Sequence, residues 1–258
     1  MSRRRVRLVL GSLLVMVACG GEGRSVSPPP SGPPVTSRST PSIGGSPSGS
    51  PSASGTEVPP SASPTPDGAV LVEIPAATAA REVDVGALAG EGNDVTGRWI
   101  GRVGAGEQLI VAVAGDGDAF ARDRSVWRWA PDAGLGGWVG VPLLEYPARR
   151  GVLSIDAVVT DVTGDGDDDA LVFALTGGSG GCGIWSVVDL ASTRPVYRRD
   201  LCDGTIDPST GPVGLLVQES VYRPGDPHCC PSARRETVLT YDDADGRWDI
   251  VRREMSNL

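Results

Sequence analysis

Asp161-Val-Thr-Gly-Asp-Gly-Asp-Asp-Asp169 is the stretch from which the fold of this chain can be worked out. An apolar run of strand length, Ala-Leu-Val-Phe-Ala-Leu, follows it directly at residues 170–175. Residues 152–160, just before it, are rich in Val, Ile and Thr, which is typical of a strand. The pattern therefore predicts two strands joined by a short acidic loop.

The acidic loop has the residue types and spacing of a calcium-binding loop. A hard divalent cation takes six to eight oxygen ligands, which alternate residues of a tight loop can supply when a glycine stands at its sixth position. Counted from Asp161, side-chain oxygens stand at positions 1, 3, 5 and 9, the carbonyl of position 7 adds a ligand, and position 6 is Gly166. The predicted ligands of a structural Ca²⁺ ion are therefore Asp161, Thr163, Asp165, Asp167 and Asp169.

The loop departs from an EF-hand, because position 12 is Val172 rather than a glutamate. The pattern also leaves the side chain of Asp168 unused. The alternative interpretation is an acidic hairpin turn without an ion, since Asp and Gly are ordinary turn residues. A cation is favoured because so many adjacent carboxylates would otherwise repel one another.

At these residues the chain resembles the calcium loop of FG-GAP/VCBS-type β repeats, whose D-x-[DN]-G-D-G-x-x-D pattern runs straight into a buried strand. The resemblance covers one loop only. It implies an ion that stabilises a blade-type sheet.

Short runs of strand character recur along residues 67–258, separated by turn clusters. The candidate strands are residues 70–74, 98–103, 108–113, 125–130, 137–142, 152–160, 170–175, 183–190, 195–201, 213–222, 235–241 and 247–253. A weak repeat relates residues 109–129 to 170–187, and about three such units fit, fewer than the four to eight blades of a closed propeller. The sequence predicts an all-β domain, an irregular or incomplete propeller-like (FG-GAP-like) assembly of antiparallel sheets.

The N-terminal region has the features of an exported lipoprotein. Residues 1–18 have arginines before a short apolar run, as in a signal peptide, and end at Cys19. They resemble a bacterial lipoprotein signal, which implies lipidation of Cys19 and a cell-membrane location on the extracytoplasmic face. The alternative is a plain secretory peptide. Residues 19–66 are mostly Ser, Pro, Gly and Thr and predict a disordered linker that holds the domain, residues 67–258, away from its anchor.

The other cysteines suit an oxidising compartment. Cys182, Cys202, Cys229 and Cys230 form an even set, which predicts two disulfides. Because a bond between neighbouring cysteines is strained, we expect Cys229 and Cys230 each to pair with one of the other two. Zinc bound through His228 is the less favoured alternative, because adjacent residues cannot easily point at one ion.

Composition excludes several classes of function. The chain has 23 basic and 32 acidic residues and a net charge of −9, so nucleic acid is not an expected partner. With a single histidine and no nucleophile motif, the sequence predicts no catalytic residue and no enzyme. The alternative is a cell-wall glycan hydrolase that uses paired carboxylates, with some of the six tryptophans lining a sugar groove.

The C-terminal region resembles LppP/LprE-type actinobacterial lipoproteins. The resemblance rests on Gly225-Asp-Pro-His-Cys-Cys-Pro-Ser232, followed by residues 237–241 and the turn at Asp245-Gly-Arg-Trp248. Ala233 stands where that family has Gly. The resemblance implies an exported lipoprotein and no activity. We expect a lipid-anchored binding or structural module that meets a protein or glycan of the cell envelope.

Overall fold

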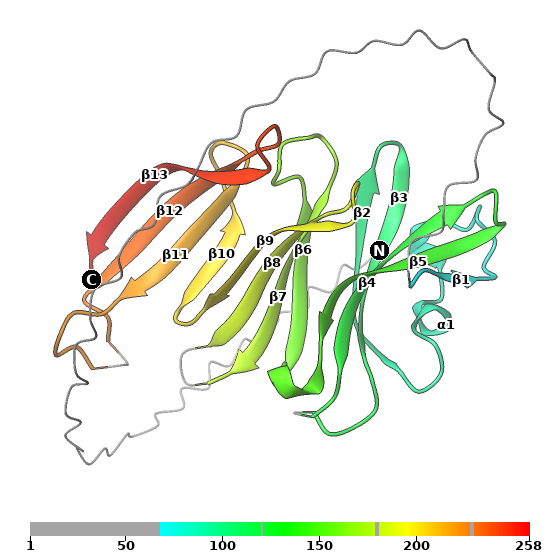
Figure 1. The fold of residues 1–258 in the computed structure, drawn as a ribbon, viewed down its shortest axis with the longest axis horizontal. Coiled ribbons are helices and arrows are strands. Elements are labelled where there is room, and N and C mark those ends of the chain that lie inside the picture. The colour runs from blue at the N-terminus through cyan, green and yellow to red at the C-terminus, as the bar shows by residue number, and fades with distance from the viewer. Residues whose placement is uncertain (1–67, 120, 179–180, 228–229) are drawn as a thin grey trace, which may run out of the picture. The chain divides into compact units, whose positions relative to one another are not determined.

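The computed structural model describes residues 68–119, 121–178, 181–227 and 230–258 (Figure 1). The predicted signal peptide, Cys19 and the linker of residues 19–66 lie outside these ranges, as do His228 and Cys229. The statements below concern the described residues alone.

The described residues form three antiparallel sheets, confirming the predicted fold class. The first sheet has the order β1-β5-β4-β3-β2, and the second and third have the orders β6-β7-β8-β9 and β10-β11-β12-β13. The first sheet contains β1 (Val70–Val72), β2 (Asp94–Val103), β3 (Gly106–Ala114), β4 (Arg124–Asp132) and β5 (Gly137–Tyr146). The second contains β6 (Ser154–Thr160), β7 (Asp169–Gly177), β8 (Cys182–Asp189) and β9 (Arg194–Leu201). The third contains β10 (Gly204–Pro208), β11 (Leu215–Val221), β12 (Ala233–Asp242) and β13 (Arg247–Asn257).

Each sheet contains four consecutive strands that pair with their neighbours in chain order, as in a propeller blade. In the first sheet β1 adds to the outer strand β5. The weak sequence repeat corresponds to this plan, since β3 and β4 occupy the same places in the first sheet as β7 and β8 in the second. The three units form an open series rather than a closed ring (Figure 1).

Apolar side chains fill both sides of the first two sheets. One buried cluster joins the first and second sheets and includes Ile110, Val126 and Val172. Another joins the second and third sheets and includes Leu171, Val187 and Leu215. The alternation of Leu171 and Val172 between these clusters shows why residues 170–175 of β7 are all apolar, because both faces of its sheet are covered.

The first sheet is partly covered on its remaining face by short helical segments. These are the 3₁₀ turn η1 (Ala80–Glu82) and the helix α1 (Val85–Ala89), whose N-cap Asp84 accepts a hydrogen bond from Gly86 N. Leu88 of α1 packs with Trp129 and Trp138 in a third buried cluster. A second 3₁₀ turn, η2 (Ala148–Arg150), follows β5.

Part of the face of the third sheet that lies opposite its core is polar. Val217 packs toward the second sheet, so its neighbour Gln218 lies on the other face. Gln218 Nε2 donates to Glu236 Oε1 at 2.8 Å, and Arg234 donates to Gln218 Oε1. This polar face can remain in water, so the series of sheets can end here without a fourth blade.

Where the second and third sheets meet, Glu219 accepts from two arginines. Its side chain is 11% exposed and bonds Arg235 at 2.9 Å and Arg199. Both arginines are about a third exposed, which weakens the pair relative to a fully buried one.

We expect Glu219→Ala to lower the free energy of unfolding by about 2 kcal/mol, because it leaves two partly buried guanidinium groups without their acceptor. Urea unfolding measures the loss. The control is Glu254→Ala, which removes an exposed ion pair of 3.7 Å with Arg252 and should cost less than about 0.5 kcal/mol. Equal losses in the two variants would contradict this role of Glu219.

Every predicted strand overlaps a strand of the structure, whereas β10, α1 and the two 3₁₀ turns were not predicted. β10 was missed because Gly-Thr-Ile-Asp-Pro offers a single large apolar residue between turn formers. α1 was missed because five residues are too few to show a helical period.

Candidate functional site

The acidic loop joins β6 to β7, as the sequence predicted, and its aspartates hold the loop's own main chain. Asp161 Oδ1 accepts from Gly164 N at 2.6 Å, and its Oδ2 accepts from Gly166 N at 3.1 Å. Asp165 Oδ1 accepts from Asp167 N at 2.9 Å. Gly164 and Gly166 have φ of +88° and +93°, a conformation that favours glycine and allows this tight turn.

Asp169, the last predicted ligand, is the first residue of β7 and is only 1% exposed. Its Oδ2 accepts from Val162 N at 2.9 Å, from Thr163 N at 2.8 Å and from Thr163 Oγ1 at 3.0 Å. Burial raises the pKa of Asp169 to about 6, although these hydrogen bonds act in the opposite direction. A buried carboxylate of this kind would be stabilised in its charged form by a nearby cation.

The remaining two aspartates of the loop bind the first sheet. Asp167 Oδ1 accepts from Gly104 N at 2.6 Å, and Asp168 Oδ2 accepts from Arg102 N at 2.7 Å. Asp168 N also donates to Arg102 O at 2.8 Å. These bonds connect the loop to the β2–β3 hairpin. The side chain of Asp168, which the calcium pattern leaves unused, therefore has a structural partner.

The loop has the hard oxygen donors that calcium prefers, but their carboxylates are not gathered around one point. Within the described ranges, no group of three or more His, Cys, Asp or Glu side chains is placed to hold a metal ion. Asp161, Asp165 and Asp169 each use oxygens to accept main-chain N–H groups instead. The calcium site stays a prediction, and it requires these side chains to turn toward a common ion.

The structure contradicts the expected pairing of the cysteines. Cys182 is bonded to Cys202, with 4.0 Å between their Cα atoms. Gly183 and Leu201, the next residues inward, are register partners on β8 and β9, so the bond closes the end of this hairpin. The pairing follows the register of β8 and β9, which brings these two cysteines together, rather than the strain between neighbouring cysteines. Cys229 lies outside the described residues, and Cys230 is exposed.

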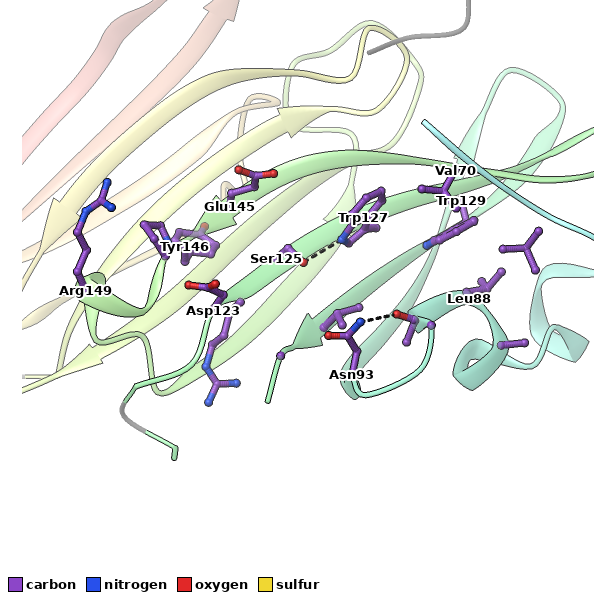
Figure 2. Close-up of a pocket in the computed structure, with 18 residues that line it drawn as sticks. Val70, Leu88, Asn93, Asp123, Ser125, Trp127, Trp129, Glu145, Tyr146 and Arg149 are labelled. Carbon is purple, nitrogen blue, oxygen red and sulfur yellow. Dashed lines mark hydrogen bonds between the residues drawn. The ribbon is translucent and has the colours of Figure 1, made fainter. Parts of the chain in front are cut away.

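Some tryptophans lie wholly in the core, and others line a pocket at the surface. Trp138 is 1% exposed and belongs to the core, whereas Trp127 is half-buried and lies beside Trp129 with 6.1 Å between ring centroids. These two rings line a pocket of about 740 Å³ on the face of the first sheet that α1 only partly covers (Figure 2). This volume is within the range of about 300–1,000 Å³ for small-molecule sites.

The pocket follows from the alternation of β4. Ser125, Trp127 and Trp129 lie on its pocket face, while Val126 packs on the opposite face against the second sheet. Gly140 lies opposite Trp129 in β5, and a Cβ there would come within 2.6 Å of the indole. The ring can therefore lie over the sheet because residue 140 is glycine. α1 and β1 complete the apolar wall with Leu88 and Val70.

Polar groups gather at one end of the pocket, where α1 does not reach. Figure 2 shows Asp123 just before β4 and Ser125 and Trp127 along it, with Glu145 of β5 beside them. Ser125 Oγ accepts from Trp127 Nε1 at 2.8 Å, which fixes the ring. Asp123 Oδ1 accepts from Ala148 N at 2.7 Å, so this carboxylate also supports η2.

Other polar groups of the pocket have unused hydrogen-bonding capacity. The side chains of Glu145 and Arg149 are exposed and form no hydrogen bond or ion pair with any described residue. Asn93 uses its amide nitrogen on Ala89 O at 2.9 Å and has a carbonyl oxygen to spare. The Nε1–H of Trp129 is buried without a partner among the described residues.

Sequence reasoning did not find this pocket. The alternation of serine and two tryptophans on one face of residues 125–129 was visible, but the walls come from α1 and β1, which lie far earlier in the chain. Glu145 is paired opposite Ser125 by the register of β4 and β5, which the sequence alone does not set.

No helix among the described residues is long and apolar enough to cross a membrane. Comparison of the chain with protein-family models, curated proteins and solved structures gave no match.

Proposed function

We propose that this chain is a lipid-anchored binding module of the cell envelope, stabilised by calcium and a disulfide, whose ligand binds in the pocket of the first sheet. The pocket is the observation that supports the proposal. It combines a half-buried aromatic ring with polar groups that have no partner among the described residues, and such groups fix a ligand's orientation in small-molecule sites.

A binding role is favoured over catalysis by the chemistry of the pocket. Its described lining contains no histidine, cysteine or lysine, so it offers no imidazole, thiol or amine for nucleophilic or general-base catalysis. The Ser125 hydroxyl accepts an indole N–H and has no basic partner among the described residues.

The second candidate remains a cell-wall glycan hydrolase that uses paired carboxylates. The observation that favours it is that Asp123 and Glu145 line the same pocket. Glycosidases need one carboxyl group as acid and the other as nucleophile or base. Asp123 is already committed to Ala148 N, which makes it the weaker member of such a pair.

The test of the pocket is retention of the detergent-solubilised full-length chain on purified, insoluble wall material. We expect the parent chain to sediment with the wall and Trp127→Ala to stay in solution, while no reducing ends are released. Release of reducing ends by the parent, lost in Glu145→Gln, would replace binding by hydrolysis. Equal sedimentation of parent and Trp127→Ala would exclude the pocket as the binding site.

The proposed anchor has its own test at Cys19, a residue outside the described ranges. We expect Cys19→Ala to move the chain from the membrane fraction to the medium or to leave an uncleaved precursor, because the acylated residue is lost. Fractionation followed by immunoblotting measures this. Cys230→Ser is the control that should leave the location unchanged. An unchanged membrane fraction for Cys19→Ala would contradict lipid anchoring.

A further inference from the structure

The geometry points to a saccharide chain as the ligand of the pocket in the first sheet, and we propose that Trp127 is the platform on which one sugar ring stacks. This inference rests on the proposed binding function and adds the chemical class of the ligand. The shape of the pocket suits a chain of sugars. A pocket of about 740 Å³ that is open to solvent at its polar end admits part of a longer chain.

The aromatic wall of the pocket suits a sugar ring. The negative face of an indole attracts weakly positive C–H groups, and a pyranose presents several of them on one side of its ring. Trp127 suits this contact because its indole is held by the bond to Ser125 Oγ and is only half-buried. Trp129 lies deeper, stacked beside it at an interplanar angle of 27°. Of the two rings, Trp127 is therefore the one that a ligand can reach, while Trp129, which is 2% exposed, packs beside it.

The charged side chains of the pocket favour a neutral ligand. The lining contains two acidic side chains, Asp123 and Glu145, and two arginines, Arg124 and Arg149. Burial lowers the pKa of Arg124, with Arg122 acting in the same direction, but its guanidinium is held by Val152 O at 2.8 Å. Arg124 is 4% exposed and Asp123 accepts from Ala148 N, so Glu145 and Arg149, one of each sign, remain as the charged side chains without a partner among the described residues. This balance favours an uncharged ligand over a simple cation or anion. A neutral ligand that is rich in hydroxyl groups meets this condition.

The polar groups of the pocket match the hydroxyl groups of a sugar. Sugar hydroxyls both donate and accept, and the pocket offers both kinds of partner. Glu145 and the carbonyl oxygen of Asn93 accept, whereas Arg149 donates. The unpaired Nε1–H of Trp129 is a further donor at the inner end, which a ligand oxygen could reach after a small shift of the ring.

The experiment is calorimetric titration of the full-length chain in detergent with linear β-1,4-linked tetrasaccharides of glucose and of N-acetylglucosamine. We expect at least one to bind, Trp127→Ala to weaken it about tenfold or more, and Glu145→Gln to weaken it by less. Trp248→Ala is the control for Trp127→Ala and should leave sugar binding unchanged, because Trp248 lies in the third sheet with its Nε1 donating to Val196 O at 3.0 Å. Thermal unfolding checks that each variant is folded.

The outcomes separate this inference from the proposed function. If Trp127→Ala abolishes wall retention but neither tetrasaccharide binds the parent chain, the pocket is the site and its ligand is not a saccharide. Binding of tetramethylammonium in place of the sugars would likewise overturn the inference in favour of a cationic ligand held by the aromatic rings. Sugar binding that is unchanged in Trp127→Ala would place the sugar elsewhere.

Discussion

Exchanging Cys182 and Cys202 together for serine is expected to lower the free energy of unfolding by about 3 kcal/mol. The bond joins residues 20 apart in sequence, and its removal frees that loop in the unfolded chain. It also opens the end of the β8–β9 hairpin in the sheet that supports both other sheets. Denaturant unfolding of the full-length chain under oxidising conditions measures the loss.

The control for this prediction exchanges Cys229 and Cys230 for serine and leaves the hairpin bond intact. We expect a reductant to destabilise the parent and this control, but to have little effect on the variant that lacks Cys182 and Cys202. A reductant effect that persists in that variant would assign the stabilisation to another bond. Peptide mapping that joins Cys182 or Cys202 to the downstream pair would contradict the structure itself.

This disulfide could have been found from the sequence by one further step. Cys182 directly precedes predicted strand 183–190, and Cys202 directly follows predicted strand 195–201. If two consecutive strands form a hairpin, residues that flank them on the outside come opposite each other. The short connection between these strands favours a hairpin, so topology was a better guide here than the strain of a vicinal bond.

The fold was more predictable than the site because strands have local signals. Apolar runs such as residues 109–113 and 170–174 identify strands covered on both faces, and the turns between them are rich in Gly and Asp. The weak sequence repeat then predicted about three blade-like units. It could not show why three suffice, because that depends on α1 covering one end of the series and on the polar face of the third sheet at the other.

The pocket illustrates what a local pattern leaves out. Its aromatic wall comes from β4, but its volume depends on where α1 and β1 lie across the sheet. The acidic loop shows the same limit. Its spacing correctly predicted a turn between β6 and β7, yet the bonds of Asp167 and Asp168 to the β2–β3 hairpin depend on contacts between sheets.

The second large effect is expected at Asp169, where pH and calcium should act on the same carboxyl group. Burial raises the pKa of Asp169 from its ordinary 3.8 to about 6, so the folded chain holds this proton more tightly than the unfolded chain. The stability that results is present in full below pH 3.8 and is lost as the pH rises through 6. The difference between these two pKa values corresponds to about 3 kcal/mol in the free energy of unfolding.

Asp169→Asn isolates this contribution from that of the other carboxylates. In chelator, we expect the parent to lose up to about 3 kcal/mol relative to the asparagine variant between pH 4 and pH 7. The amide oxygen of asparagine can still accept from Val162 N and Thr163 N, so the variant should remain folded. Thermal unfolding of both chains across this pH range gives the comparison. Parallel pH profiles would show that Asp169 ionises as freely in the folded chain as in the unfolded one.

Calcium should reverse this pH effect, because the ion requires the charged form of Asp169. At about 10 mM calcium, on the order of a hundred times a Kd of 10⁻⁴ M, we expect the parent to gain about 2.7 kcal/mol at pH 7 and little at pH 4. Asp165→Asn should lose this gain but keep most of the pH profile in chelator, because the charge of Asp165 is a smaller cause of the raised pKa of Asp169 than burial is. Asp169→Asn should lose both. Asp118→Asn, a charge removal in the exposed Gly-Asp-Gly-Asp turn after β3, is the matched control and should lose neither. A parent chain that does not respond to calcium at pH 7 would leave the loop as an acidic turn that fastens the second sheet to the first.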